Sequence, residues 1–304
     1  MENIAKSQFE PAVKSGDKEA ILRPSVSYWQ DAWRRLRKNK LAMAGLVVMI
    51  IVAALAIIVP LVSGYDYETQ NPSAVNLRPS AAHYFGTDDF GRDLWTRVWW
   101  GARISLFIGI MAALLDLVIG VLYGGISAYF GGKVDNVMQR FIEVIYSIPY
   151  LLLSILLLMV LGPGVSTIIL AYAITGWVSM ARLVRGQMLV LKEQEFVLAA
   201  RALGAKPFRI ILKHLIPNAL GVIVVQITFV VPTAIFAEAF LSFIGLGIRP
   251  PLASLGNLLS DGATYMRYHP HRLVFPTIVF SLILLSFNLL GDGLRDALDP
   301  KMRK

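Results

Sequence analysis

The sequence contains no cysteine, which excludes disulfides, thiolate nucleophiles and cysteine-ligated metals. It also lacks the Gly-x-x-x-x-Gly-Lys-Ser/Thr loop that cradles nucleotide phosphates, because Gly131-Gly132-Lys133 has neither the upstream glycine nor the following hydroxyl residue. No paired carboxylates and no Ser/His/Asp constellation can be singled out. We therefore predict a chain that is not an enzyme and holds no cofactor.

Charged residues are scarce, at 16% against 56% hydrophobic residues, and this composition is not that of a soluble globular domain. A membrane helix needs roughly 17–25 apolar residues. Six runs meet that requirement and predict an all-α membrane protein with six transmembrane helices. These runs are residues 41–62, 104–130, 144–161, 165–181, 219–237 and 273–290.

The distribution of Lys and Arg predicts the orientation of these spans. With a cytoplasmic N-terminus, 22 basic residues fall in inside segments and 7 in outside segments, as the positive-inside rule requires. We therefore expect both termini to be cytoplasmic and the first run to be a retained anchor in a bacterial cytoplasmic membrane. The expected layout is a cytoplasmic segment 1–40, a first span 41–62, an extracytoplasmic segment 63–103, a core 104–290 and a cytoplasmic tail 291–304.

One basic, amphipathic segment, residues 193–217, interrupts the apolar runs on the predicted cytoplasmic side. Its apolar spacing predicts two short helices. Gly204 should end the first helix, Pro207 should begin the second, and Pro217 should end the second. Asn218 then becomes the expected cap of the fifth span. Such a segment either rests on anionic lipid or docks a partner protein, and the local pattern alone leaves both open.

The same segment resembles the coupling segment of ABC importer permeases, whose pattern is Glu-Ala-Ala, three residues, Gly, nine residues, Ile-x-Leu-Pro. Here Ala199-Ala200 is followed by Gly204 and then by His214-Leu215-Ile216-Pro217 at the same spacing. Leu198 stands in place of the family's Glu, and His214 stands in place of its first Ile. Glu195, three residues before Leu198, is the candidate replacement for the missing charge.

Three further stretches are similar to permeases of the dipeptide, oligopeptide and nickel importer group: residues 83–106, 237–256 and 291–304. The entry to the first span, WQDAWRRLRKNKLAMAGL, resembles the C-type subunit of oligopeptide importers. The resemblance covers residues 28–304 and implies a type I ABC importer permease fold. It also implies that the core begins with the second span and that the first span wraps a partner permease.

The resemblance implies several partners: a second permease subunit, two cytoplasmic ATPase subunits that use ATP, and an extracytoplasmic peptide-binding protein. Membrane lipid surrounds the chain, and no nucleic acid is implied. The residues that would couple this chain to the ATPases lie within 193–217. They are Glu195, Ala199, Ala200, Arg201, Gly204, His214 and Pro217.

A few polar residues lie within the core spans, where charge is expensive and polar groups either line a path or join helices. Asp116 and Glu238 are the acidic candidates for a translocation path, with structural hydrogen bonding as the competing interpretation. Thr175, Trp177, Gln226 and Thr228 are the other candidates. The acidic residues between 88 and 93 do not have the spacing of an EF-hand loop, and His269-Pro270-His271 is a weak metal signal, so no metal site is predicted.

The predicted function is import of oligopeptides by an ATP-driven transporter, with this chain as one permease. The alternative is the same machine for dipeptides, nickel or another small chelate. A secondary transporter or channel would show inverted repeats and several intramembrane charges, whereas this sequence has no clear internal repeat and places only Asp116 deep in a span.

Overall fold

The computed structural model describes residues 27–299, and this part of the chain is helical and contains no β-strand. The long α-helices are α2 (Lys40–Val62), α3 (Leu94–Leu115), α11 (Ile216–Phe243) and α13 (His271–Leu298). The shorter ones are α1 (Tyr28–Lys38), α4 (Val121–Phe130), α5 (Gly132–Tyr146), α6 (Tyr150–Leu161), α7 (Val165–Thr175), α8 (Val178–Leu191), α9 (Glu195–Ala202), α10 (Pro207–Ile210) and α12 (Leu255–Tyr265). The 3-10 turn Pro72–Ala74 and the π-turns Asp116–Gly120 and Ile211–Leu215 complete the described elements.

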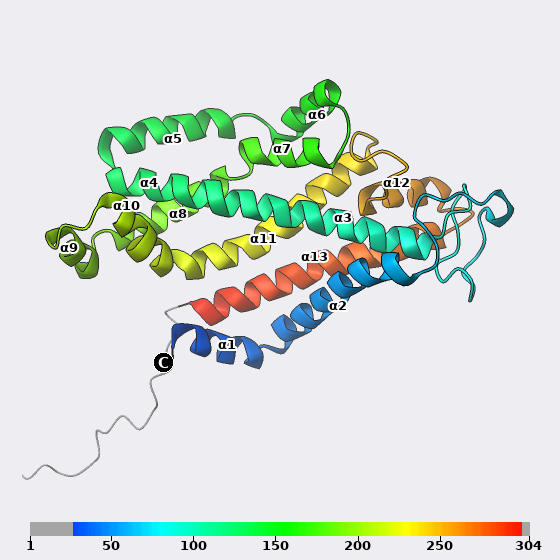
Figure 1. Cartoon of the computed structure of the whole chain (residues 1–304), viewed down its shortest axis with the longest axis horizontal. Helices are drawn as coiled ribbons and strands as arrows, with labels where there is room; N and C mark the ends of the chain where they lie inside the picture. Colours follow the sequence, from blue (N-terminus) through cyan, green and yellow to red (C-terminus); the bar gives the residue numbers. More distant parts are fainter. Residues whose placement is uncertain (1–26, 300–304) are drawn as a thin grey trace, which may run out of the picture.

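Five continuous helical stretches of the described chain are long and apolar enough to cross a membrane: Lys40–Val62, Leu94–Phe130, Val165–Leu191, Pro207–Phe243 and His271–Leu298. The pair α5 and α6 makes a sixth if it is counted as one span. The long helices lie side by side, with α9 and α10 at one end of the bundle and α12 at the other (Figure 1). We call these the α9 end and the α12 end.

Both ends of the described chain meet beside the bundle. The Tyr28 hydroxyl donates a hydrogen bond to the Leu298 carbonyl at 3.3 Å. Helix α1 begins with a reciprocal capping box between Ser27 and Gln30, which satisfies two otherwise unpaired donors at the helix start. The start of α1 therefore lies beside the end of α13.

The third predicted span is not a single straight helix. Helices α5 and α6 meet at an angle of 70°, and Pro149 lies at the junction with extended backbone, φ −61° and ψ 120°. Proline has no N–H to donate and disfavours helical backbone at the residue before it. Pro149 therefore separates α5 from α6, whereas Pro60, Pro232 and Pro276 lie inside helices.

The second helical stretch, Leu94–Phe130, extends beyond the predicted apolar run 104–130. The second begins at Leu94 rather than at residue 104, because the Asp93 carboxylate caps it by accepting the Thr96 N–H at 2.9 Å. The charge of Arg97 is accommodated within the helix, since its guanidinium donates to the Tyr67 carbonyl at 2.7 Å. The helix therefore starts in a polar cap at the α12 end.

Close helix approach depends on glycine at two contacts. A Cβ on Gly124 would lie 2.4 Å from the Ala181 carbonyl oxygen, and one on Gly293 would lie 2.2 Å from the Ala42 Cβ. Both distances are far below van der Waals contact. Gly124 thus permits α4 to pack on α8, and Gly293 permits α13 to pack on α2, as small residues do in membrane bundles.

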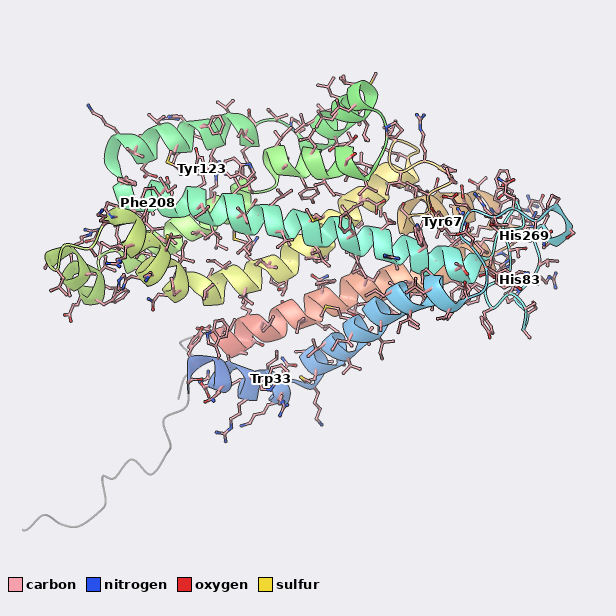
Figure 2. All side chains as sticks on the ribbon, viewed as in Figure 1. Trp33, Tyr67, His83, Tyr123, Phe208 and His269 are labelled. Atoms are coloured by element: carbon pink, nitrogen blue, oxygen red, sulfur yellow. The ribbon has the colours of Figure 1, made fainter. Side chains whose placement is uncertain are left out.

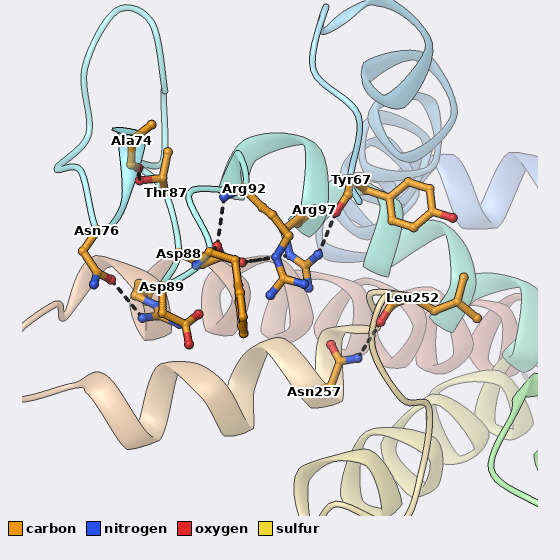
Figure 3. A network of polar contacts seen from close by, with 12 residues as sticks. Tyr67, Ala74, Asn76, Thr87, Asp88, Asp89, Arg92, Arg97, Leu252 and Asn257 are labelled. Carbon is orange, nitrogen blue, oxygen red and sulfur yellow. Dashed lines mark hydrogen bonds and ion pairs between the residues drawn. The ribbon is translucent and has the colours of Figure 1, made fainter. Parts of the chain in front are cut away.

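The α12 end is closed by a polar network between the 63–93 segment and helices α3 and α13 (Figure 3). The Asp88 carboxylate accepts the Arg92 Nε–H at 2.7 Å and lies 3.5 Å from the Arg97 Nε. Arg272, which is 2% exposed, donates to the Asp89 carboxylate at 3.0 Å. These ion pairs neutralise buried charge and fix the loop on the helix ends.

Candidate functional site

The first candidate site is the segment around α9, which projects from the α9 end of the bundle (Figure 1). Its alanines favour helix, and Glu195 lies in the first turn, where a carboxylate complements the helix dipole. Gly204 has φ +77°. The Gly204 N–H donates to the Arg201 carbonyl at 2.9 Å and the Ala205 N–H donates to the Ala200 carbonyl at 3.0 Å, which together form a Schellman motif.

The predicted end of the second short helix is wrong. The chain continues as one helical stretch from Pro207 to Phe243, and Pro217 lies in the first turn of α11. The π-turn Ile211–Leu215 precedes it, and there the Ile216 N–H bonds to the Ile211 carbonyl. Asn218 is not an N-cap, because its side chain donates to the His214 carbonyl at 2.6 Å within the helix. The segment is therefore continuous with the fifth span.

The segment buries one face and exposes the other. Val197 is 0% exposed and Ala200 is 8% exposed, and both pack in a cluster with residues of α8, α10 and α11. Leu203, Phe208 and Leu212 are instead 88%, 60% and 51% exposed, and Figure 2 shows Phe208 at the α9 end. We call these three side chains the apolar tip.

The remaining predicted coupling residues surround this tip. Glu195, Ala199 and Pro217 are exposed. Arg201 is exposed as well, and its guanidinium lies 5.1 Å from the centre of the Tyr129 ring. His214 is half-buried within the π-turn. Ala200 faces the bundle instead, so Ala199 and Gly204 are the small residues among the predicted coupling residues that are exposed.

An ion pair that the sequence did not single out connects three helices near this segment. Both carboxylate oxygens of Asp135 on α5 accept from the Arg185 guanidinium on α8, at 2.6 Å and 2.5 Å. The Ser127 hydroxyl on α4 also donates to Asp135, at 2.5 Å. Lys192 donates to the Ala128 carbonyl at 3.0 Å. Bidentate Arg–carboxylate pairs are geometrically specific, so this network fixes α4, α5 and α8 relative to one another beside the segment.

The second candidate site is a cavity of about 500 Å³ among the helices. Its walls come from the bend between α5 and α6, from α7, from the start of α8 and from α11. The lining residues are Asp116, Ile145, Tyr146, Ile148, Pro149, Tyr150, Tyr172, Thr175, Gly176, Ser179, Gln226, Phe229, Val230, Thr233 and Ala237. Three predicted path residues, Asp116, Thr175 and Gln226, are thus brought together.

The other three predicted path residues lie elsewhere. Trp177 is 5% exposed in a cluster with Ile142, and its Nε1–H donates to the Ile174 carbonyl at 3.1 Å. The Thr228 hydroxyl donates to the Val225 carbonyl at 2.6 Å. Glu238 is fully buried and is held by serine hydroxyls rather than directed into the cavity. The hydrogen bonds of Trp177 and Thr228 are local, whereas Glu238 joins α11 to α3 through Ser105.

The acidic cluster of the 63–93 segment serves structure at the α12 end. Asp93 accepts from the His83 Nδ1 at 2.8 Å, while Asp88 and Asp89 pair with arginines. Within residues 27–299, no group of three or more His, Asp or Glu side chains could hold a metal ion. Burial raises the pKa of the nearby Asp261 carboxyl above its usual range, although Arg97 acts in the opposite direction.

Comparison with known protein families decides the class of protein. The profile described as "binding-protein-dependent transport system inner membrane component" matches residues 105–304. The chain belongs to this family. The N-terminal part, residues 27–79, matches the N-terminal TM domain of oligopeptide transport permease C, so this family member carries both the core and the additional N-terminal span.

Similar proteins are known in sequence and in structure. The dipeptide transport system permease protein DppC of Bacillus subtilis is 56% identical over 96% of this chain and 91% of its own length. The oligopeptide transport system permease protein OppC of the same organism is 53% identical over 100% of both chains. The OppC of Escherichia coli K12 is 46% identical over 91% of this chain and 92% of its own.

Solved structures of the MetNI methionine ABC transporter in inward-facing conformations share the fold. One has a TM-score of 0.56 at 20% identity and covers 68% of this chain and 97% of that chain. A second has a TM-score of 0.53 at 21% identity, with 66% and 94% covered. The predicted all-helical type I ABC importer permease fold is therefore confirmed.

Proposed function

We propose that this chain is a permease subunit of an ATP-driven importer of oligopeptides. The supporting observation is the 53% identity to an oligopeptide permease along 100% of both chains. The 56% identity to a dipeptide permease favours dipeptides as the second candidate. Both candidates use the same division of labour: this chain forms part of the passage, and partner subunits hydrolyse ATP.

The geometry of 193–217 supports its role as the coupling segment. The apolar tip is exposed at the end of the bundle, and its backbone is fixed by the Schellman motif at Gly204. The buried side of the segment continues into α11, whose residues Gln226 and Phe229 line the cavity. Movement imposed by an ATPase on the tip would therefore reach the cavity through one continuous helical stretch.

The test of substrate class is uptake by the assembled transporter. The chain, its partner permease, the two ATPases and the binding protein are reconstituted into proteoliposomes, and entry of radiolabelled di-alanine and penta-alanine is measured with ATP. We expect ATP-dependent entry of penta-alanine. Entry of di-alanine alone would favour the dipeptide candidate, and entry of neither peptide would contradict the proposed function.

The energy source can be tested on the chain alone. Because the sequence lacks a phosphate-cradling loop, we expect the purified, ATPase-free chain to show no binding of a fluorescent ATP analogue at concentrations that saturate the ATPase subunits. The isolated ATPases are the positive control. Saturable binding to the isolated permease would contradict the proposed division of labour.

The proposed orientation places both termini and the α9 end in the cytoplasm, and it can be tested in a chain that has no native cysteine. Single substitutions Thr69→Cys and Arg267→Cys, both at exposed positions near the α12 end, should react with an impermeant maleimide in intact cells. Lys133→Cys, at an exposed position in the first turn of α5, should react only after the membrane is opened. The reverse pattern would invert the proposed topology.

A further inference from the structure

Asp116 differs from every other buried acidic residue in the described part of the chain. The buried acids are Asp88, Asp93, Asp116, Asp135 and Glu238. Four of them accept hydrogen bonds from arginine, histidine or serine side chains. Asp116 is 2% exposed, and its Oδ1 has no hydrogen-bond partner among the described residues. A buried polar atom in this state is costly.

Asp116 lies in the wall of the cavity, and its unpaired Oδ1 is buried there. Asp116 begins the π-turn Asp116–Gly120, a type of bulge that is frequent at functional sites. A Cβ on Gly176 would lie 3.2 Å from the Asp116 Oδ1, so a side chain at this position would crowd the carboxylate. The Tyr150 hydroxyl on the same cavity also lacks a hydrogen-bond partner.

The charged and aromatic residues that line the cavity favour a cation as its occupant. Asp116 is the one acidic residue among the lining residues, and none of them is Lys, Arg or His. The rings of Tyr146, Tyr150, Tyr172 and Phe229 line the same space, and aromatic faces also attract cations. The volume of about 500 Å³ is within the roughly 300–1,000 Å³ typical of small-molecule sites.

We propose that the Asp116 carboxylate binds the N-terminal ammonium group of a peptide as it passes through this cavity. The proposal rests on the proposed function, since it names the substrate group that this site recognises. A free ammonium group is common to linear peptides whatever their side chains, so one carboxylate can serve many sequences. Hydroxyl and amide groups of Thr175, Ser179 and Gln226, which line the same cavity, offer hydrogen bonds to the peptide backbone.

A direct test uses chemical cross-linking in the assembled transporter without ATP. Dicyclohexylcarbodiimide activates a carboxyl group, which condenses with a primary amine to an amide while the reagent leaves as the urea. With tri-alanine present, we expect mass spectrometry to find the Asp116 carboxyl joined by an amide bond to the N-terminus of tri-alanine. N-acetyl-tri-alanine should give none. A wild-type complex in which tri-alanine forms no amide at Asp116 would overturn the proposal.

Transport supplies the second measurement. In Asp116→Asn the side chain keeps its shape but loses its charge, and we expect ATP-driven uptake of tri-alanine at subsaturating concentration to fall about tenfold, the size of one lost charged hydrogen bond. The matched control Asp292→Asn removes an exposed charge from α13 and should transport as wild type. Undiminished uptake by Asp116→Asn would overturn the proposal. Absence of uptake by the wild-type complex would instead contradict the proposed function, while the cross-link still decides the role of Asp116.

Discussion

Replacing Gly204 by valine is expected to reduce ATP-driven uptake about tenfold or more, while the chain remains in the membrane at wild-type abundance. The glycine has φ +77°, and a left-handed backbone costs an ordinary residue about 1–2 kcal/mol, with a β-branched side chain among the least tolerated. Such a cost corresponds to about a tenfold change in an equilibrium. Unwinding of the end of α9 would relieve this backbone strain and would displace Leu203 and the rest of the apolar tip.

Two control variants separate backbone strain from added bulk. No atom lies within 4 Å of a Cβ built on Gly204, so a larger side chain meets no clash inside the chain. Gly204→Asn adds bulk but tolerates a left-handed backbone, as Asn76 does here with φ 53°. Gly186→Val adds the same side chain as the test variant at an exposed helical position with open space. Both controls should retain most uptake.

The measurements are membrane abundance, co-purification of the ATPase subunits and peptide uptake in one strain. The coupling interpretation expects Gly204→Val to lose co-purification and uptake together. A segment that merely rests on lipid would tolerate an added apolar side chain. Wild-type co-purification and uptake in Gly204→Val would therefore favour the lipid interpretation.

The sequence predicted the features that depend on residues close together in the chain, namely the apolar spans and the ends of helices. Apolar runs identified the membrane-crossing helices, because a span must bury its length in lipid. The left-handed backbone at Gly204 followed from a glycine after a helical stretch. Helix α12 carried a similar signal that was missed: Ser254 and Asn257 form a reciprocal capping box before an apolar turn.

Features decided by tertiary contacts were not predictable from the sequence. Pro149 breaks a helix, whereas Pro60 and Pro232 lie within helices. The outcome depends on whether neighbouring helices satisfy the freed backbone groups. Pro217 likewise lies in a helix because a π-turn precedes it.

The roles of the two lone acids in the core spans depend on partners that are distant in the chain. Asp116 lies deep in the predicted second span and Glu238 just after the predicted fifth run, and the sequence does not show which of the two carboxylates has partners. Ser105, which donates to Glu238, lies 133 residues away from it. The structure therefore separates a hydrogen-bonded carboxylate, Glu238, from one with an unpaired oxygen, Asp116, and we expect their variants to lose stability and uptake respectively.

Glu238→Ala is expected to destabilise the folded chain strongly. Glu238 is 0% exposed and accepts from the Ser105 hydroxyl at 2.9 Å and the Ser242 hydroxyl at 2.8 Å. Alanine would leave both buried hydroxyls without this acceptor, at about 1–3 kcal/mol for each unsatisfied group, and would open a void between α3 and α11. The apparent melting temperature of the purified chain should fall by several degrees, and membrane abundance should fall with it.

The contacts around Glu238 explain why its replacement should also weaken the packing between α11 and α12. The Ser242 hydroxyl also accepts the Ile248 N–H at 3.1 Å, and a Cβ on Gly256 would lie 2.5 Å from the Ala239 carbonyl oxygen, so α11 and α12 are tightly packed at this point. Glu238→Gln keeps an acceptor oxygen in the same shape and should retain most of the stability. If Glu238→Ala retained the wild-type melting temperature and abundance but lost uptake, Glu238 would belong to the translocation path rather than to the framework that holds α3, α11 and α12 together.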